Sequence, residues 1–414
     1  MSLIPKIEKV TRDATITHFL LMFGYKLFSL YFPLFLITRG FSLPEVGYNY
    51  LLIYLPIALC APLVGFFNHK INPAILATVG ILGYGIYALG MILIPPYHSS
   101  LWYGVFYFWQ VILGISAALF FVSVRTILIS SPLENYDRAF GWFYSAPFYA
   151  DATAPAVGAL FIWKFNFIGV FIFSLILQIF TAIFCFIQLK KQGIKPLNKF
   201  FTPLHKLWGG VKENYQKIFQ KIKRPASGYP DVLSPLLISF SVLLVSGFYQ
   251  AFLVLFLKNL LQWSQNLILV FVSVFSFLFL PVSLLLINRL TRFRSEKNIF
   301  QGGIITGIFS ILFGAMVPMI NFFSILLINF GRAAGDLICN SGRSGLISQR
   351  LKENPEEAGA VDTIFSPLGI ALGALISGSI IGFLGFQLLF IFGGIFIIAV
   401  GILTSNLAKK GTLR

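Results

Sequence analysis

The sequence predicts an all-α integral membrane protein with twelve transmembrane helices in two groups of six. Three observations lead to this prediction. First, 57% of the 414 residues are hydrophobic and 11% are charged, with a mean hydropathy of +0.85, whereas about 25% of residues are charged in soluble domains. Second, the chain contains apolar runs of about 20 residues, the length that crosses the hydrocarbon core of a bilayer. Third, Lys and Arg are concentrated in alternate loops, as in multi-pass membrane proteins.

The apolar runs are separated by short polar segments, except in the middle of the chain. They lie near residues 14–36, 44–65, 74–94, 101–124, 140–162, 166–188, 232–257, 264–287, 298–319, 321–347, 360–384 and 386–407. The long exception, 189–231, separates the first six runs from the last six. The sequence therefore predicts a six-helix bundle over 1–188, a cytoplasmic linker over 189–231 and a second six-helix bundle over 232–414.

The basic residues predict the orientation. The two termini and the loops after even-numbered runs carry 26 Lys and Arg, whereas the other side carries three, Arg39, Lys164 and Lys258. The remaining two, Lys26 and Arg332, fall inside apolar runs. Loops rich in Lys and Arg stay on the cytoplasmic side. We therefore expect a multi-pass plasma (inner) membrane protein with both termini in the cytoplasm. The net charge of +17 is explained in this way, without a nucleic-acid partner.

The linker, residues 189–231, combines basic and apolar periodicity. It contains ten Lys and Arg against two acids. Apolar residues recur at spacings of three and four at Leu204, Leu207, Trp208, Val211, Tyr215, Ile218, Phe219 and Ile222. This pattern predicts a basic amphipathic helix lying on the anionic inner leaflet of the bilayer. Its role is left open between a tether joining two bundles and a helix that senses lipid or a partner.

The two groups of six contain traces of an internal repeat. The segment after the second run reads "PLVGFFNHK" and the one after the eighth reads "PVSLLLINR". Aligned, they pair Pro62 with Pro281, His69 with Asn288, and Lys70 with Arg289. The fourth and tenth runs also end alike, at Arg125 and Arg343. Such duplication is common among secondary transporters.

With these residues the chain resembles the major facilitator superfamily over 14–188 and 232–408. Gly65 and Lys70 match the family's motif between spans 2 and 3, although His69 stands where that motif has Asp. The resemblance implies two six-helix bundles that rock about a central cavity. Spans 1, 4, 7 and 10 would line the cavity, and spans 2, 5, 8 and 11 would form the interface between bundles.

Two further details refine the resemblance. In span 5, Pro155 and Gly158 of "ATAPAVGAL" match a Gly-Pro-x-x-Gly pattern frequent in exporters of the family, with Ala154 in place of the first Gly. In span 4, Gln110 stands where many proton-coupled members have Arg. The resemblance therefore favours an exporter fold while leaving the coupling residues to be found elsewhere.

Four ionisable residues lie near the middle of apolar runs: Lys26, Asp151, Arg332 and Asp336. Each charge at the centre of a helix costs about 2.5–3.5 kcal/mol on insertion scales, so such groups are paired or face water. Arg332 and Asp336 can pair within one helix at a spacing of four, and we expect Lys26 to reach Asp151 or Asp336. We interpret the two carboxylates as proton-coupling candidates, and the two cations as groups that set proton affinity or hold an anionic part of the substrate. Static ion pairs that fix helix register are the alternative.

Other polar and aromatic residues fall into two sets of candidates. Further substrate contacts are expected at Gln110, Gln250, Tyr25, Trp109, Tyr249 and Asn340. Inner-gate contacts at the cytoplasmic ends of the helices are expected at His69, Lys70, Arg125, Asp137, Arg138, Asn288, Arg289, Arg343, Glu357 and Asp362. The ionised members of this second set predict ion pairs that close the cytoplasmic side and break when it opens; solvated loop charges are the alternative.

These patterns predict a secondary active transporter that works by alternating access, foremost a proton-coupled exporter of small amphiphilic compounds. The alternatives are an importer or exchanger of a polar or anionic metabolite, a lipid or lysolipid flippase, and a non-transporting receptor of the same fold. No catalytic triad spacing, metal-ligand cluster or phosphate-binding loop occurs in the sequence, so we expect neither an enzyme nor a cofactor or metal site. The expected partners are a small-molecule substrate, a proton or other ion and the bilayer, and the expected state is a monomer.

Overall fold

The computed structural model describes residues 5–30, 32–94, 100–192, 216 and 233–411, which fold into helices with no strand in these ranges. The first half comprises α1 (Lys9–Ser29), α2 (Phe32–Thr38), α3 (Leu43–Asn68), α4 (Pro73–Ile92), α5 (Ser100–Ser130), α6 (Tyr136–Leu189) and η1 (Lys190–Gln192). The second half comprises α8 (Leu233–Leu255), η2 (Phe256–Leu260), α9 (Gln265–Leu290), α10 (Ser295–Ala315), η3 (Val317–Met319), α11 (Phe322–Arg350) and α12 (Pro355–Gly411). The predicted amphipathic linker helix lies outside the described residues.

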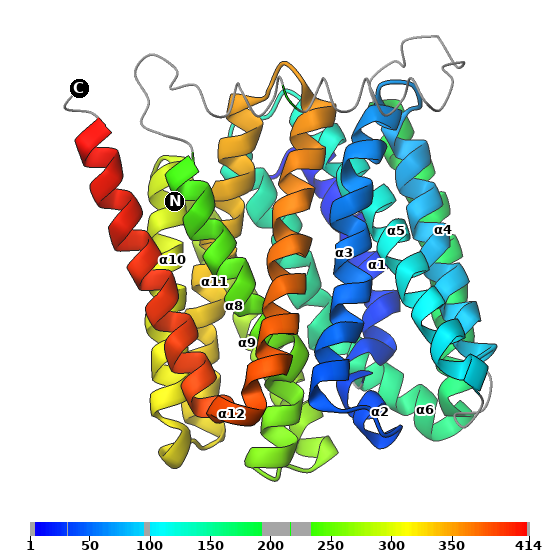
Figure 1. Cartoon of the computed structure of the whole chain (residues 1–414). Coiled ribbons are helices and arrows are strands. Elements are labelled where there is room, and N and C mark those ends of the chain that lie inside the picture. The colour runs from blue at the N-terminus through cyan, green and yellow to red at the C-terminus, as the bar shows by residue number, and fades with distance from the viewer. Residues whose placement is uncertain (1–4, 31, 95–99, 193–215, 217–232, 412–414) are drawn as a thin grey trace.

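The molecule is a multi-pass membrane protein. Within the described ranges, nine helices are long and apolar enough to cross a bilayer. Two of them, α6 and α12, have 54 and 57 residues, about 80 Å each if they were straight. Each contains one residue with positive φ, Asn166 at 59° and Gly385 at 69°, and α12 visibly turns back on itself (Figure 1). Both reversals fall between pairs of predicted spans; the total of twelve spans remains a prediction.

The first apolar run differs from its prediction of one span over 14–36. Helix α1 begins earlier, at Lys9, and ends at Ser29, and the separate helix α2 begins at Phe32. Pro33 supplies the physical reason, because a proline inside a helix lacks an N–H and its ring clashes with the carbonyl four residues before it. That carbonyl belongs to Ser29, the last residue of α1.

Side-chain caps fix where several helices start. The backbone N–H of Ser42 donates to Glu45 at 2.6 Å in the capping box of α3. Asn72 accepts a hydrogen bond from the backbone of Ala74 at the start of α4, and Asn135 does the same for Arg138 at the start of α6. These residues satisfy backbone N–H groups that have no partner within the helix.

Four short connections lie at the end of the bundle that carries both termini (Figure 1). They are residues 69–72, 131–135, 291–294 and 351–354. We call this the terminal end. The other end, which contains the reversals at Asn166 and Gly385, is called the opposite end.

The two halves touch closely where small residues face the partner helix. A Cβ added to Gly47 of α3 would collide with the carbonyl oxygen of Ala374 on α12. A Cβ added to Gly345 of α11 would collide with the carboxylate of Asp137 on α6. Glycine at these positions allows helices of the two halves to approach to backbone distance.

Candidate functional site

At the terminal end, a buried acid forms ion pairs that join the two halves. Asp362, in the second turn of α12, is fully buried and forms ion pairs with two arginines. Arg343 Nε lies 2.9 Å from Asp362 Oδ1, and Arg125 Nε lies 3.3 Å from Asp362 Oδ2. Arg125 comes from α5 of the first half, and its Nη1 also donates to Thr363 Oγ1 at 2.7 Å. The sequence predicted ion pairs among these residues, and the structure places them across the two halves.

Two residues that the sequence did not single out complete this group. Tyr144, on α6, accepts a hydrogen bond from Arg343 Nη2 at 3.0 Å, and its hydroxyl lies 2.7 Å from Ser344 Oγ. Ser344 donates in turn to Asp362 at 2.7 Å. We call Arg125, Tyr144, Arg343, Ser344 and Asp362 the terminal-end cluster. One of sixteen tyrosines in an apolar chain carries no sequence signal of such a role.

A second contact between the halves is made by Asp137, in the first turn of α6. It accepts hydrogen bonds from Ser295 Oγ and Asn298 Nδ2 of α10, each at 2.7 Å. We expected an ion pair here; the partners are neutral instead. The first turn of α10 supplies both donors, and only the packing of α6 against that turn brings them to Asp137.

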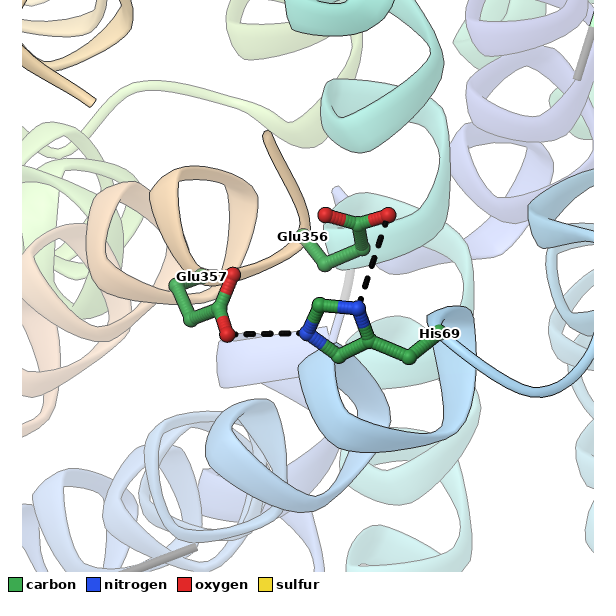
Figure 2. A group of neighbouring side chains, drawn as sticks. All are labelled: His69, Glu356 and Glu357. Carbon is green, nitrogen blue, oxygen red and sulfur yellow. Dashed lines mark hydrogen bonds and ion pairs between the residues drawn. The ribbon is translucent and has the colours of Figure 1, made fainter. Parts of the chain in front are cut away.

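The third contact joins His69, the residue directly after α3, to the first turn of α12 (Figure 2). His69 Nε2 lies 2.8 Å from Glu357 Oε1, and Nδ1 lies 3.7 Å from Glu356 Oε1. The hydrogen bond to Glu357 raises the pKa of His69 above its ordinary value of 6.5, although burial opposes this rise. Glu356 was not among the predicted gate residues, although it adjoins Glu357 in the sequence.

The pH dependence of this contact has a definite sign. Because the pKa of folded His69 is raised, the ion pair contributes fully below pH 6.5 and is lost as the pH rises through the raised value. We expect the fraction of molecules closed at the terminal end to fall as the pH is increased from 6 to about 9 in metal-free buffer. Distances between spin labels across that end would measure it. In Glu357→Gln the slope should flatten, and closure that instead strengthens with pH contradicts the assignment.

Other predicted gate residues lie elsewhere or make local contacts. Arg138 pairs with Glu8 at 2.6 Å and with Glu134 at 3.1 Å, both within the first half, so these ion pairs do not join the halves as expected. The cause is the start of α1, which brings Glu8 to α6. Lys70 lies over the ring of Phe66, and Arg289 over that of Phe293. Asn288 is half-buried in the last turn of α9.

The first intramembrane pair links α1 to α6. Lys26 Nζ lies 3.0 Å from Asp151, so of the two partners that the sequence left open the structure selects Asp151. The side chains are 27% and 19% exposed. Asp151 lies in the part of α6 before the reversal at Asn166. This part packs on α1 through Gly158, where a Cβ would collide with the carbonyl oxygen of Leu27. This close packing brings the two charges within reach.

The second pair lies within α11. Arg332 Nη1 lies 2.7 Å from Asp336 Oδ2, at the spacing of four that the sequence indicated. Asp336 also accepts hydrogen bonds from Thr306 of α10 at 3.1 Å and Ser246 of α8 at 3.2 Å. The guanidinium of Arg332 lies 4.1 Å from the ring centre of Tyr249. These contacts hold the acid between three helices of the second half.

Helical geometry shows which way the two pairs face. Asp151 follows Tyr144 by seven residues, which returns it to within about 20° of the same face of α6. Arg332 precedes Arg343 by eleven residues, which gives about the same offset on α11. Tyr144 and Arg343 touch across the halves. The two ion pairs therefore lie on the same helix faces as this interhalf contact, about 10–16 Å farther along the helices.

The remaining substrate-contact candidates are differently placed. Gln110 is fully buried and lies 3.3 Å from the hydroxyl of Tyr87, and Trp109 packs against Gly90 of α4. Neither residue lines the space between the halves, because this face of α5 packs within the first half. Tyr25 packs edge-on against Phe28 and Tyr84. Asn340 accepts a hydrogen bond from Arg343 at 2.7 Å.

Gln250 bridges the halves. The hydroxyl of Tyr54, on α3, donates to Gln250 Oε1 of α8 at 2.6 Å. Gln250 is exposed. Tyr54 was not predicted. The sequence indicates a role for Tyr54 only through a group of three tyrosines along α3: Tyr48, Tyr50 and Tyr54.

A cavity of about 820 Å³ opens at the opposite end. It lies between the first half and the start of α9, and its walls are mainly aromatic and aliphatic. Its lining includes Phe28, Phe32, Arg39, Trp102, Trp163 and Asn266. This volume lies within the usual range for small-molecule pockets, about 300–1,000 Å³. None of the predicted substrate contacts lines it. Half of them lie on α8 and α11, which contribute no residue to its walls, and the rest lie elsewhere on α1 and α5.

Comparisons with known proteins agree on the fold. The human organic anion transporter MFSD10 (TETRAN) superposes with a TM-score of 0.72 at 15% identity, covering 95% of this chain and 99% of that one. A POT family transporter in complex with a thioalcohol-conjugated peptide gives 0.69 at 14% identity, with 97% and 96% covered. A bacterial homologue of the iron transporter ferroportin, in an outward-facing state, gives 0.64 at 15% identity, with 98% and 100% covered.

The sequence itself is assigned by a family model rather than by a near relative. A comparison with curated protein sequences gives no match. The model that describes the Major Facilitator Superfamily matches residues 14–361. This match covers most of the chain and agrees with the helix pairs and the interhalf contacts described above. The chain belongs to the major facilitator superfamily of membrane transporters.

Proposed function

We propose that this chain is a proton-coupled secondary transporter that exports small amphiphilic compounds by alternating access. One observation carries the proposal. Each half holds a partly exposed ion pair near the middle of its predicted spans, Lys26 with Asp151 and Arg332 with Asp336, and the two pairs lie on the helix faces that also carry an interhalf contact. Charges at this depth are costly unless they are used or paired, and they mark transport pathways by default.

The chemistry of such pairs suits proton coupling. A nearby cation lowers the proton affinity of a carboxylate. The affinity rises when the cation moves away. Lys26 and Asp151 sit on different helices, so a change in the packing of α1 against α6 separates them. In our proposal the Lys26–Asp151 pair couples protonation to the rocking of the halves. Arg332 and Asp336 sit on one helix and stay close in either state, which favours a positioning role for them.

The terminal end supports an alternating mechanism. Three interhalf contacts, centred on Asp362, Asp137 and His69, hold it closed, whereas the cavity opens at the opposite end. We propose that the terminal end is the cytoplasmic side, as the distribution of Lys and Arg indicates. The conformation described is then closed to the cytoplasm, and these contacts must break for a substrate to enter from inside.

Amphiphilic substrates are suggested by the cavity walls. Trp102, Trp163 and neighbouring phenylalanines give an apolar surface, and Arg39 and Asn266 add a few polar groups. This composition suits compounds with an apolar body and one polar end. The Pro155–Gly158 segment, which resembles an exporter pattern, also keeps α1 and α6 in close contact through Gly158.

A second candidate function is exchange of an organic anion. It is favoured by Lys26, the most exposed member of the two intramembrane pairs at 27%. An anionic group that reaches this ammonium could compete with Asp151. Neutralising Lys26 would then abolish anion flux, whereas proton-coupled export depends on the acid.

Proteoliposomes that enclose a pH-sensitive dye test the proposal. A panel of lipophilic cations, organic anions and sugars is applied to the wild type, Asp151→Asn and Asp336→Asn. We expect a compound-evoked pH change in the wild type that falls at least tenfold in Asp151→Asn, with a smaller loss in Asp336→Asn. If the folded wild-type protein gives no pH change with any compound, the proposal of proton coupling is wrong. If the compound-evoked pH change persists in both Asp151→Asn and Asp336→Asn, neither acid carries the proton.

A further inference from the structure

The contact between His69 and α12 has the composition of a metal site. One potential ligand atom from each of His69, Glu356 and Glu357 lies within 4.8 Å of those of the other two. Figure 2 shows the imidazole between the two carboxylates, with Glu357 facing one ring nitrogen and Glu356 the other. The sequence shows no metal-ligand spacing because His69 and Glu357 are 288 positions apart. Only the packing of the two halves assembles this group.

A hydrogen-bonded ion pair does not satisfy the whole group. Glu356 and Glu357 are each 7% exposed, and Glu357 Oε2 is buried with no hydrogen-bond partner. Two nearly buried carboxylates share one imidazole, so negative charge exceeds positive charge within the group. A buried carboxylate oxygen without a partner is costly. A divalent cation would neutralise both acids and use the free oxygen.

The distances fit a metal ion after a small movement. Zinc binds histidine nitrogen and carboxylate oxygen at about 2.0–2.2 Å in tetrahedral geometry, so any two ligand atoms of one ion lie about 3.4 Å apart. Bringing atoms that lie up to 4.8 Å apart to this separation needs a combined side-chain movement of about 1.5 Å. One nitrogen and two carboxylate ligands with an open fourth position is a set that zinc accepts. Imidazole also selects transition metals over Ca²⁺ and Mg²⁺.

Neighbouring contacts hold the histidine in place. Asn68, the residue before His69, donates to Thr126 Oγ1 at 3.1 Å and accepts from Ser123 Oγ at 3.1 Å, both on α5. The end of α3 is therefore fixed against its own half. Glu356 and Glu357 lie in the first turn of α12, which belongs to the other half. Ligands held in this way form a complete set only when the terminal end is closed.

We propose that His69, Glu356 and Glu357 bind one divalent transition-metal ion of the zinc class, which bridges the two halves and stabilises the closed terminal end. The ion is a regulator in this proposal. Its site lies apart from the intramembrane pairs, and its binding is measurable without any transported substrate. The proposal therefore stands or falls independently of the proposed transport function.

Calorimetric titration of the full-length protein in lipid nanodiscs with Zn²⁺, after treatment with a chelator, tests the binding. We expect one ion per chain, and an affinity at least tenfold weaker in His69→Asn, Glu356→Gln and Glu357→Gln. Glu353→Gln is the matched control, since Glu353 is an exposed acid in the connection just before α12. It should bind within twofold of the wild type. Equal affinities in all variants, or a control as weak as the site variants, overturn the site.

A distance measurement tests the bridge and also guards against misfolded variants. Spin labels at Phe67→Cys and Lys352→Cys, in a background without native cysteines, report the separation across the terminal end. Zn²⁺ should increase the population with the short distance in the wild-type site but leave Glu357→Gln unchanged. Ca²⁺ at equal concentration should have no effect. Zinc that binds without changing the distance distribution rules out a bridge between the halves.

Discussion

Asp362→Asn should open the terminal end and destabilise the protein by about 3–5 kcal/mol, the usual cost of removing one partner from a buried ion pair. The fully buried carboxylate pairs with Arg343 and Arg125 and accepts from Ser344. The amide keeps the shape but removes the only negative charge of the terminal-end cluster, so two buried guanidinium groups repel each other. Thermal unfolding and spin-label distances across the terminal end would measure the two effects.

A matched acid substitution separates this effect from a general loss of charge. Glu134→Gln removes an acid that pairs with Arg138 and Lys6 and is 57% exposed. Solvent and salt screen exposed ion pairs, so this variant should stay near the wild type. Adding Arg125→Met to Asp362→Asn should recover part of the stability, because one unpaired charge is then gone. If Asp362→Asn is as stable and as closed as Glu134→Gln, the terminal-end cluster does not hold the halves together.

Exchanging Lys26 and Asp151 should separate a structural role from proton coupling. In Lys26→Asp/Asp151→Lys the ion pair is preserved with its charges reversed, so stability should return to near the wild-type value. The single variant Asp151→Asn leaves an ammonium without its partner and should be less stable. If the acid on α6 carries the proton, the exchanged pair restores folding but leaves compound-evoked proton movement at least tenfold below the wild type.

A control for the Lys26/Asp151 exchange is a substitution of a lysine that lies away from this ion pair. Lys164→Met removes the same residue type next to the reversal of α6, at the opposite end of the molecule, where the ammonium is exposed beside Phe165. Its proton movement should match that of the wild type. Full activity of the exchanged pair would instead support a static ion pair, the alternative that the sequence left open.

Local geometry explains which contacts could be predicted from the sequence. Arg332 and Asp336 are four residues apart on one helix, so their contact depends only on helical periodicity. For Lys26 the sequence could say that a partner was needed but could not choose between two acids, because the choice depends on how α6 packs on α1. The arginine pairs of Asp362 were expected from their common depth at one membrane face. Charge and span limits are sufficient for such predictions.

Other features depend on helix rotation, which an apolar sequence does not specify. Trp109 was expected in the cavity but packs on Gly90, because both faces of α5 are apolar enough to be buried. Tyr144 was missed because its neighbours along α6 are also aromatic. Asp137 finds Ser295 and Asn298, which are neutral and give no signal of pairing. These contacts arise only after the halves have docked.

The reversals at Asn166 and Gly385 have a consequence for how the protein is made. Each joins two long apolar limbs through a single residue of positive φ, with hardly any polar connection between them. The second helical segment of each pair follows the first without a polar loop that could separate their insertion into the membrane. Residues 136–189 and 355–411 should therefore enter the bilayer as preformed hairpins during synthesis, each delivered as one unit to a half-built bundle.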